Sequence, residues 1–190
     1  MERIYGNNYF EDVMKLFEFY DFNEMSSISG KQVLIKFNHS VDEIIYSDLQ
    51  FGGDKLLYDK KEKKMCELLE ELFSEFKDTS CLIRKYERKW IVDKTLSKEL
   101  YLTLKANNIE NHFDGMIVVK KDDKAIMQFF ESIYKYNSFV QFLFPEERMV
   151  ISPTDHMDVF IAAEDFEGLN LKLLNYFKKD NYEEIELVEV

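Results

Sequence analysis

The chain alternates short β-favouring runs with amphipathic helical stretches, and this succession constrains its fold more than any other feature. Runs rich in Val, Ile and Phe that end at turn residues are typical of strands, whereas apolar residues at every third or fourth position are typical of helices. The predicted strands cover residues 33–37, 43–46, 81–92, 113–119, 139–144, 149–151 and 159–161. The predicted helices cover residues 10–20, 59–77, 96–107, 122–136 and 164–178. This pattern favours an α+β fold with a largely antiparallel sheet and several packed helices.

Three segments carry more specific expectations. The spacing of the strands at residues 33–37 and 43–46 suits a β-hairpin. The helix at residues 59–77 opens with a lysine-rich turn, which opposes the helix dipole. Residues 185–190 alternate weakly between apolar and acidic, so they form either an edge strand or a free end.

Nothing in the sequence marks a boundary between domains. It contains no internal repeat, no linker-like tract and two prolines in 190 residues. Hydrophobic residues make up 46% of the chain, including 17 Phe and 11 Tyr, which is ample apolar area for a core. We therefore expect one compact α+β domain over residues 1–190. The side chains predicted to share its core are Leu68, Leu72, Phe76, Ile117, Val119, Phe130, Ile151 and Phe160.

The sequence predicts a cytoplasmic protein. No stretch approaches the roughly 20 uncharged apolar residues that a membrane-spanning helix needs. Residues 1–5 lack the basic and then apolar pattern of a signal peptide. Cys66 and Cys81 are too few and too far apart for a zinc knuckle or a disulfide framework, so we expect both to be reduced and buried.

The net charge of −12 favours one kind of partner over another. Repulsion disfavours binding to the phosphate backbone of a nucleic acid, whereas a basic protein suits this field. The half of the chain from residue 96 onward carries the larger share of the negative charge. The predicted partner-binding residues lie there: Glu146, Glu147, Asp155, Asp158, Glu164 and Asp165. We expect the pair at 146–147 or the pair at 155–158, but not both, to join the acids that begin the last helix.

A possible metal site begins at Asp155. Together with His156 and Asp158, and with His112 and Asp114 from another strand end, it supplies carboxylate and imidazole groups that bind divalent metals. These residue types are also common in solvated turns, and the segment follows a Ser-Pro turn. We therefore predict a turn there and no metal ion.

A second candidate site is catalytic. Asp78 followed by Glu87-x-Lys89 resembles the acid, acid-x-lysine core of restriction-endonuclease-like nucleases. The resemblance implies that two carboxylates hold a metal ion, that the lysine stabilises developing charge and that Glu71 or Glu75 completes the set. Alternating charges on an exposed strand face explain the same residues equally well.

Basic residues in the same region could support a nucleic-acid groove, or they could pair with acidic residues elsewhere in the chain. This basic run comprises Lys77, Arg84, Lys85, Arg88, Lys89, Lys94 and Lys98. The net charge argues against the groove. The metal-dependent nuclease, or another hydrolase using Asp78, Glu87 and Lys89, is therefore the alternative function.

The sequence contains no motif for a cofactor. A Walker loop, a dinucleotide glycine fingerprint, a nucleophile elbow and a His-Glu-x-x-His helix are all missing. Gly52-Gly53 alone does not make a phosphate cradle. We therefore expect no cofactor and a role in binding rather than in catalysis.

In size, in acidity and in its lack of a catalytic motif, the chain resembles the immunity proteins that bacteria make against their own polymorphic toxins. The resemblance extends over the whole chain and rests on this overall character. It implies an acidic cytosolic protein that masks a basic surface of its partner. Association would be steered by charge, and carboxylates would then occupy the toxin's active site in place of substrate phosphates.

Overall fold

The computed structural model describes residues 1–4, 8–38, 45–180 and 182–190. Its strands are β1 (Glu2–Ile4), β2 (Tyr20–Asp21), β3 (Ser26–Ser27), β4 (Val33–Phe37), β5 (Ser80–Lys85), β6 (Met116–Lys120), β7 (Val140–Phe144), β8 (Met149–Pro153), β9 (Val159–Ala163) and β10 (Ile185–Glu189). Its helices are α1 (Asn8–Lys15), the 3₁₀ helix η1 (Tyr46–Phe51), α2 (Lys55–Ser74), α3 (Lys98–Ala106), α4 (Ala125–Tyr134) and α5 (Phe166–Asp180).

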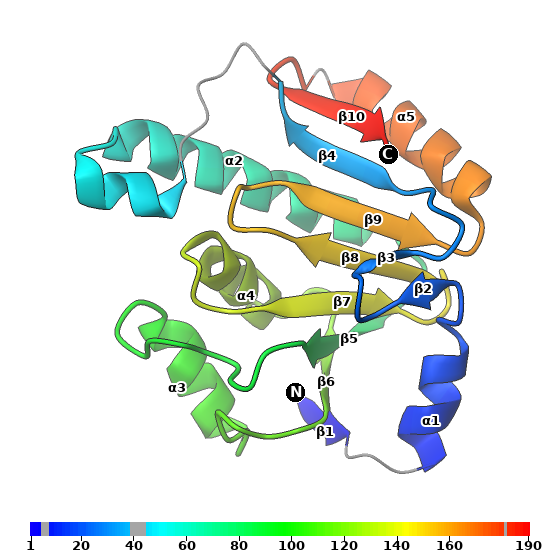
Figure 1. Ribbon diagram of the computed structural model, residues 1–190, viewed down its shortest axis with the longest axis horizontal. Coiled ribbons are helices and arrows are strands. Elements are labelled where there is room, and N and C mark those ends of the chain that lie inside the picture. Colours follow the sequence, from blue (N-terminus) through cyan, green and yellow to red (C-terminus); the bar gives the residue numbers. More distant parts are fainter. Residues whose placement is uncertain (5–7, 39–44, 181) are drawn as a thin grey trace.

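A large antiparallel sheet organises these elements. It has eight strands in the order β1-β6-β5-β7-β8-β9-β4-β10, and every neighbouring pair is antiparallel. The first and last strands of the chain therefore lie at opposite edges of the sheet (Figure 1). The predicted α+β class with an antiparallel sheet is confirmed.

One face of the sheet is covered by α2, α3, α4 and α5. Side chains alternate between the faces of a strand, so Val140, Phe142 and Phe144 of β7 all point to this helix face. Phe73 of α2 packs edge-on against Phe142 and Phe144, with ring centroids 5.8 and 4.9 Å away, and against Phe130 of α4 at 5.5 Å. Apolar burial of this extent is the main favourable contribution to folding.

The opposite face carries α1 and the small hairpin β2–β3, which crosses in front of the central strands in Figure 1. Val13, Phe17 and Tyr20 pack there against Leu82 and Leu143 of the sheet. We call this side the hairpin face. Because it is covered by fewer elements than the helix face, part of its surface near β4 and β10 stays half exposed.

The predicted core is correct except at Phe160. Seven of its eight side chains are buried in the cluster of the helix face: Leu68, Leu72, Phe76, Ile117, Val119, Phe130 and Ile151. Phe160 lies between Val159 and Ile161, which point to the helix face, so its own side chain points to the hairpin face and is half buried. The strand was predicted correctly, but Phe160 was assigned to the wrong one of its two faces.

The first part of α2 differs from its prediction. The helix begins at Lys55, and the Asp54 side chain caps it by accepting a hydrogen bond from the Leu57 amide at 3.1 Å. Its lysine-rich stretch therefore lies further inside the helix, away from the positive end of the dipole. The helix also follows Gly53 more closely than the sequence suggested.

The predicted hairpin between residues 33–37 and 43–46 is wrong. β4 pairs with β9 on one side and with β10 on the other. Tyr46 begins η1 instead of continuing a strand, and residues 43–44 lie outside the described residues. The partner of β4 is supplied by residues 185–189, which resolves the alternatives for that segment in favour of the edge strand.

The strand predicted at residues 81–92 is correct in its first half. β5 ends at Lys85, and the chain then turns so that Trp90 is buried on the helix face. The Trp90 indole donates a hydrogen bond to the Phe113 carbonyl at 3.0 Å, and its backbone amide donates to the Asn111 carbonyl at 3.0 Å. Burial of this ring thus overrides the β propensity of the segment. The predicted helix at 10–20 also stops early, at Lys15.

Cys66 of α2 and Cys81 of β5 are free and buried, as predicted. Burial raises the pKa of both thiols, so they are in the neutral form at physiological pH. Within the described residues, no helix is long and apolar enough to span a membrane.

Replacing Phe73 with alanine tests the packing of α2 on β7. We expect Phe73→Ala to lower the free energy of unfolding by about 3–5 kcal/mol, because the cavity would remove contacts to the rings of Phe76, Phe130, Phe142 and Phe144. Phe51→Ala is the matched control, since that ring is 88% exposed. Equilibrium denaturation with urea measures both. A similar loss in the two variants would contradict this account of the core.

Candidate functional site

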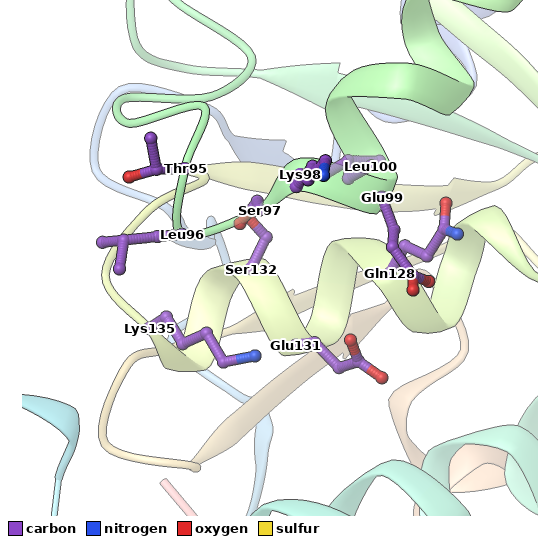
Figure 2. A pocket seen from close by; sticks show the side chains of 10 residues that line it. All are labelled: Thr95, Leu96, Ser97, Lys98, Glu99, Leu100, Gln128, Glu131, Ser132 and Lys135. Atoms are coloured by element: carbon purple, nitrogen blue, oxygen red, sulfur yellow. The ribbon is translucent and has the colours of Figure 1, made fainter.

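A groove lies between α4 and the N-terminal end of α3, with a volume of ≈ 240 Å³. Figure 2 shows its lining side chains, which come from the segment leading into α3 and from one side of α4. They are Thr95, Leu96, Ser97, Lys98, Glu99, Leu100, Gln128, Glu131, Ser132 and Lys135. We call it the α3–α4 groove.

The segment before α3 is held in place by the buried side chain of Asn137, just after α4. The Asn137 amide donates to the Asp93 carbonyl at 2.8 Å and to Ser97 Oγ at 2.7 Å, and its oxygen accepts from the Asp93 amide at 2.6 Å. Asp93 in turn accepts hydrogen bonds from the amide and the hydroxyl of Thr95, which lowers the pKa of its carboxyl. A loop with so many internal bonds is a fixed wall of the groove.

Two serine hydroxyls form the floor. Ser97 Oγ donates to Ser132 Oγ at 2.7 Å, and the two side chains face each other in Figure 2. Both are buried, as is Asn137. The polar groups below the groove are therefore satisfied mostly by one another, which stabilises its shape.

The rim is charged and partly unsatisfied. Lys135 Nζ lies 3.6 Å from Glu62 Oε1 of α2. Burial raises the pKa of the Glu62 carboxyl, and the nearby Lys135 acts in the opposite direction. Gln128 Oε1 is buried without a hydrogen-bond partner in the described structure, and Glu131 is exposed beside it. Together with Glu99 these side chains offer more acceptors than donors.

A second hollow adjoins the groove and shares Leu96 and Lys135 with it. This end hollow has a volume of ≈ 570 Å³, and its other lining residues are Tyr46, Ser47, Gln50, Tyr136, Asp155 and His156. Its aromatic wall is Tyr136, which is 63% exposed and has a positive φ of 54°. A bulky residue with positive φ is uncommon, and here it ends α4 and turns the ring outward. Leu96 is 41% exposed at the same place.

The two serines on the floor of the groove have no base beside them among the described residues. A hydroxyl nucleophile needs an adjacent base. Ser97 Oγ instead donates a hydrogen bond to Ser132 Oγ and accepts one from the Asn137 side-chain amide. The described part of the chain contains no group of three or more His, Cys, Asp or Glu side chains that could hold a metal ion. Aromatic side chains are enriched at the centre of protein interfaces, and the rim around them is polar.

The structure divides the predicted partner-binding acids between two ends of the sheet. Glu146 and Glu147 lie in the β7–β8 turn, beside Glu164 and Asp165 after β9, whereas Asp155 and Asp158 lie in the β8–β9 turn at the other end. The pair at 146–147 is therefore the one that joins the acids before α5. Asp155 lines the end hollow.

Three of the four acids at the end of the sheet near α5 form hydrogen bonds or ion pairs within the chain. Glu147 accepts a hydrogen bond from the Lys77 amide at 2.8 Å, which together with Lys172 lowers the pKa of its carboxyl against the effect of burial. Arg148 Nη1 donates to both carboxylate oxygens of Glu164, at 2.8 and 2.9 Å. Asp165 accepts from the Gly168 amide at 3.0 Å, in the first turn of α5. These contacts give the acids a structural role.

The residues of the nuclease alternative are not brought together. Asp78 precedes β5 and is buried, whereas Glu87 and Lys89 follow β5 and are exposed. They therefore lie at opposite ends of a six-residue strand, about 20 Å apart at roughly 3.3 Å per residue. The Asp78 carboxylate accepts hydrogen bonds from the amides of Glu146 and Glu147 at 3.0 and 3.1 Å, so it holds the β7–β8 turn.

Sequence reasoning missed the residues that build the groove. Asn137 acts through hydrogen bonds to a loop about 40 residues earlier in the chain, and no local pattern reports such a contact. The acids Glu99 and Glu131 are on different helices and meet through helix packing. Leu96 and Tyr136 could have indicated the surface, because each is a large apolar residue among turn-forming residues, one just before α3 and the other just after α4.

Comparisons with known proteins give no family assignment. No protein-family description matches the chain, and no curated protein or solved structure matches it either.

The structural role of Asp78 can be tested by stability. We expect Asp78→Ala to lower the free energy of unfolding by about 2–4 kcal/mol, because the backbone amides of Glu146 and Glu147 would lose a buried, charged acceptor. Glu75→Ala, which removes an exposed carboxylate close by, should change it by less than about 0.5 kcal/mol. Urea denaturation followed by circular dichroism measures both. Equal stability of the two variants would show that the β7–β8 turn does not need this carboxylate.

Proposed function

We propose that this chain is an acidic, cytosolic binding protein that masks a basic surface of a protein partner, and that it does so with the α3–α4 groove and the end hollow. The observation that carries the proposal is the exposure of Tyr136 and Leu96 within a surface that also presents Glu99, Glu131 and Asp155. The aromatic side chain would serve as the anchor and the carboxylates as a charged rim.

Charge complementarity supports a basic partner. The chain carries a net charge of −12, which attracts cations over a distance of about 8–10 Å at physiological salt. Arginine and lysine side chains of a partner could bind the exposed Glu99 and Glu131 in the groove while apolar groups cover Tyr136. Steering would raise the association rate, and the apolar contacts would slow dissociation.

In its most specific form the proposal is an immunity protein that neutralises a toxin. The size and acidity of the chain support this form. Carboxylates of the rim would then bind the toxin residues that otherwise bind substrate phosphates. A hydrolase is the weaker alternative, because Asp78 is buried at one end of β5 and Glu87 and Lys89 lie beyond the other.

The anchor can be tested once a partner has been purified from the cells that make this protein. We expect Tyr136→Ala to raise the dissociation constant by about 30-fold, the loss of roughly 2 kcal/mol typical of an interface anchor. Leu171→Ala on α5 is the control, because Leu171 is 62% exposed and lies on a different helix. Surface plasmon resonance measures both. Equal affinity of the two variants would exclude the end hollow.

The rim can be tested by association kinetics. Reversing Glu99, Glu131 and Asp155 to lysine should slow association by about tenfold at low salt and should flatten its salt dependence. The matched control reverses three exposed acids near the other end of the sheet: Glu75, Glu146 and Glu167. Stopped-flow measurements at several salt concentrations compare the two. A larger effect from the control set would move the binding surface to the end near α5.

A further inference from the structure

Arg84 is a half-buried cation on the hairpin face of the sheet, away from the α3–α4 groove. Its guanidinium carbon lies 4.6 Å from the centroid of the Phe22 ring, which follows β2 and covers it. Its Nη1 donates a long hydrogen bond, 3.4 Å, to Gln141 Oε1 of β7. The guanidinium is therefore held between an aromatic ring and an amide oxygen.

The orientation of Gln141 is fixed by a buried polar network. The Gln141 amide nitrogen donates to Tyr20 Oη at 2.9 Å and to Ser152 Oγ at 3.3 Å, and these two hydroxyls are 3.1 Å apart. Both donors of the amide are thus used on the inner side, and its oxygen is left to face Arg84. This network also fastens the hairpin that carries Phe22, so the guanidinium is positioned before any ligand arrives.

The charge of Arg84 is only partly compensated. Burial lowers the pKa of its guanidinium, Tyr20 and the Asp114 carboxylate act in the opposite direction, and within the described residues Arg84 forms no direct ion pair. The adjacent Lys85, in contrast, lies 3.3 Å from Asp114 Oδ1. Removing a cation from water without a counter-ion is costly, and four of the five N–H donors of the guanidinium have no acceptor in the described structure.

A pocket opens beside this cation. It has a volume of ≈ 410 Å³ and is lined by Phe22, Asn23 and Met25 of the hairpin, by residues 84–87 and by Asp114. Small-molecule sites commonly have such volumes and combine apolar walls with a few oriented polar groups. We call it the hairpin pocket.

We propose that the hairpin pocket binds the single carboxylate of a small organic acid, with Arg84 as the anchor and Phe22 and Met25 in contact with the apolar body of that acid. A guanidinium matches a carboxylate through two parallel hydrogen bonds. Glu87 and Asp114 in the wall disfavour a dianion such as a phosphate, because a second negative charge would be repelled. This site is separate from the proposed protein-binding surface.

The same carboxylate could belong to a free acid or to the C-terminus of a peptide, and two probes distinguish these sources. Phenylacetate represents the free acid. A short peptide ending in phenylalanine, with its terminus free or amidated, represents the other. If the free peptide binds more tightly than phenylacetate, the natural ligand is a chain terminus, and if phenylacetate binds more tightly, it is a small acid.

The test is an NMR titration of the ¹⁵N-labelled chain with phenylacetate, phenylacetamide and phenyl phosphate. We expect phenylacetate to bind at least about tenfold more tightly than the other two, with saturable shifts of the Arg84 Nε–Hε signal and of the Asn23 and Met25 amides. R84Q should lose this preference. R88Q, which removes an exposed arginine in the following bend, should keep it.

Two results would overturn the proposal. One is equal affinity of the wild-type chain for phenylacetate and phenylacetamide, or no saturable binding of either. The other is an unchanged preference in R84Q. The titration of the wild-type chain decides the matter even if R84Q fails to fold, because the Arg84 signal itself reports whether the carboxylate reaches it. Tighter binding of phenyl phosphate would contradict the argument from Glu87 and Asp114.

Discussion

The packing of Phe73 against the aromatic rings of β7 and α4 is the contact on which the arrangement of this protein most depends. It joins α2 to Phe142 and Phe144 of the central strand β7 and to Phe130 of α4. Because β7 is buried on both faces, the position of this strand is fixed by the helices on one side and by the hairpin on the other. The segments at the two ends of β7, the α4–β7 connection and the β7–β8 turn, are therefore fixed in position as well.

The candidate binding surface is built at the point where α4 passes into β7. Tyr136 turns outward through its positive φ, and the next residue, Asn137, turns inward and fastens the segment at Asp93 and Ser97. One turn of chain thus sets both the exposed anchor and the wall of the groove. A surface fixed in this way loses little conformational entropy when a partner binds, which favours affinity.

The sequence predicted what depends on local periodicity. The spacing of Leu68, Leu72 and Phe76 identified the buried side of α2, and the apolar run at residues 139–144 identified the central strand. Contacts distant in sequence could not be read in this way. Phe160 was placed on the wrong face because, in a fully apolar run, the sequence does not show which residues point to which side of the strand. Asp78 looked catalytic because the two turn amides that donate hydrogen bonds to it, those of Glu146 and Glu147, leave no local signal in the sequence. The partner-binding acids were predicted from charge alone, and the antiparallel strands place them at two opposite ends of the sheet.

Hydrogen–deuterium exchange of the chain with and without its purified partner tests the central claim most directly. It needs no substitution, and it reports on both ends of the sheet at once. The account predicts slower exchange in residues 93–100, 131–137 and 154–158 of the complex, with no change in the β7–β8 turn or the first turn of α5. Protection of residues 145–148 and 164–168, with unchanged exchange around Tyr136, would contradict it.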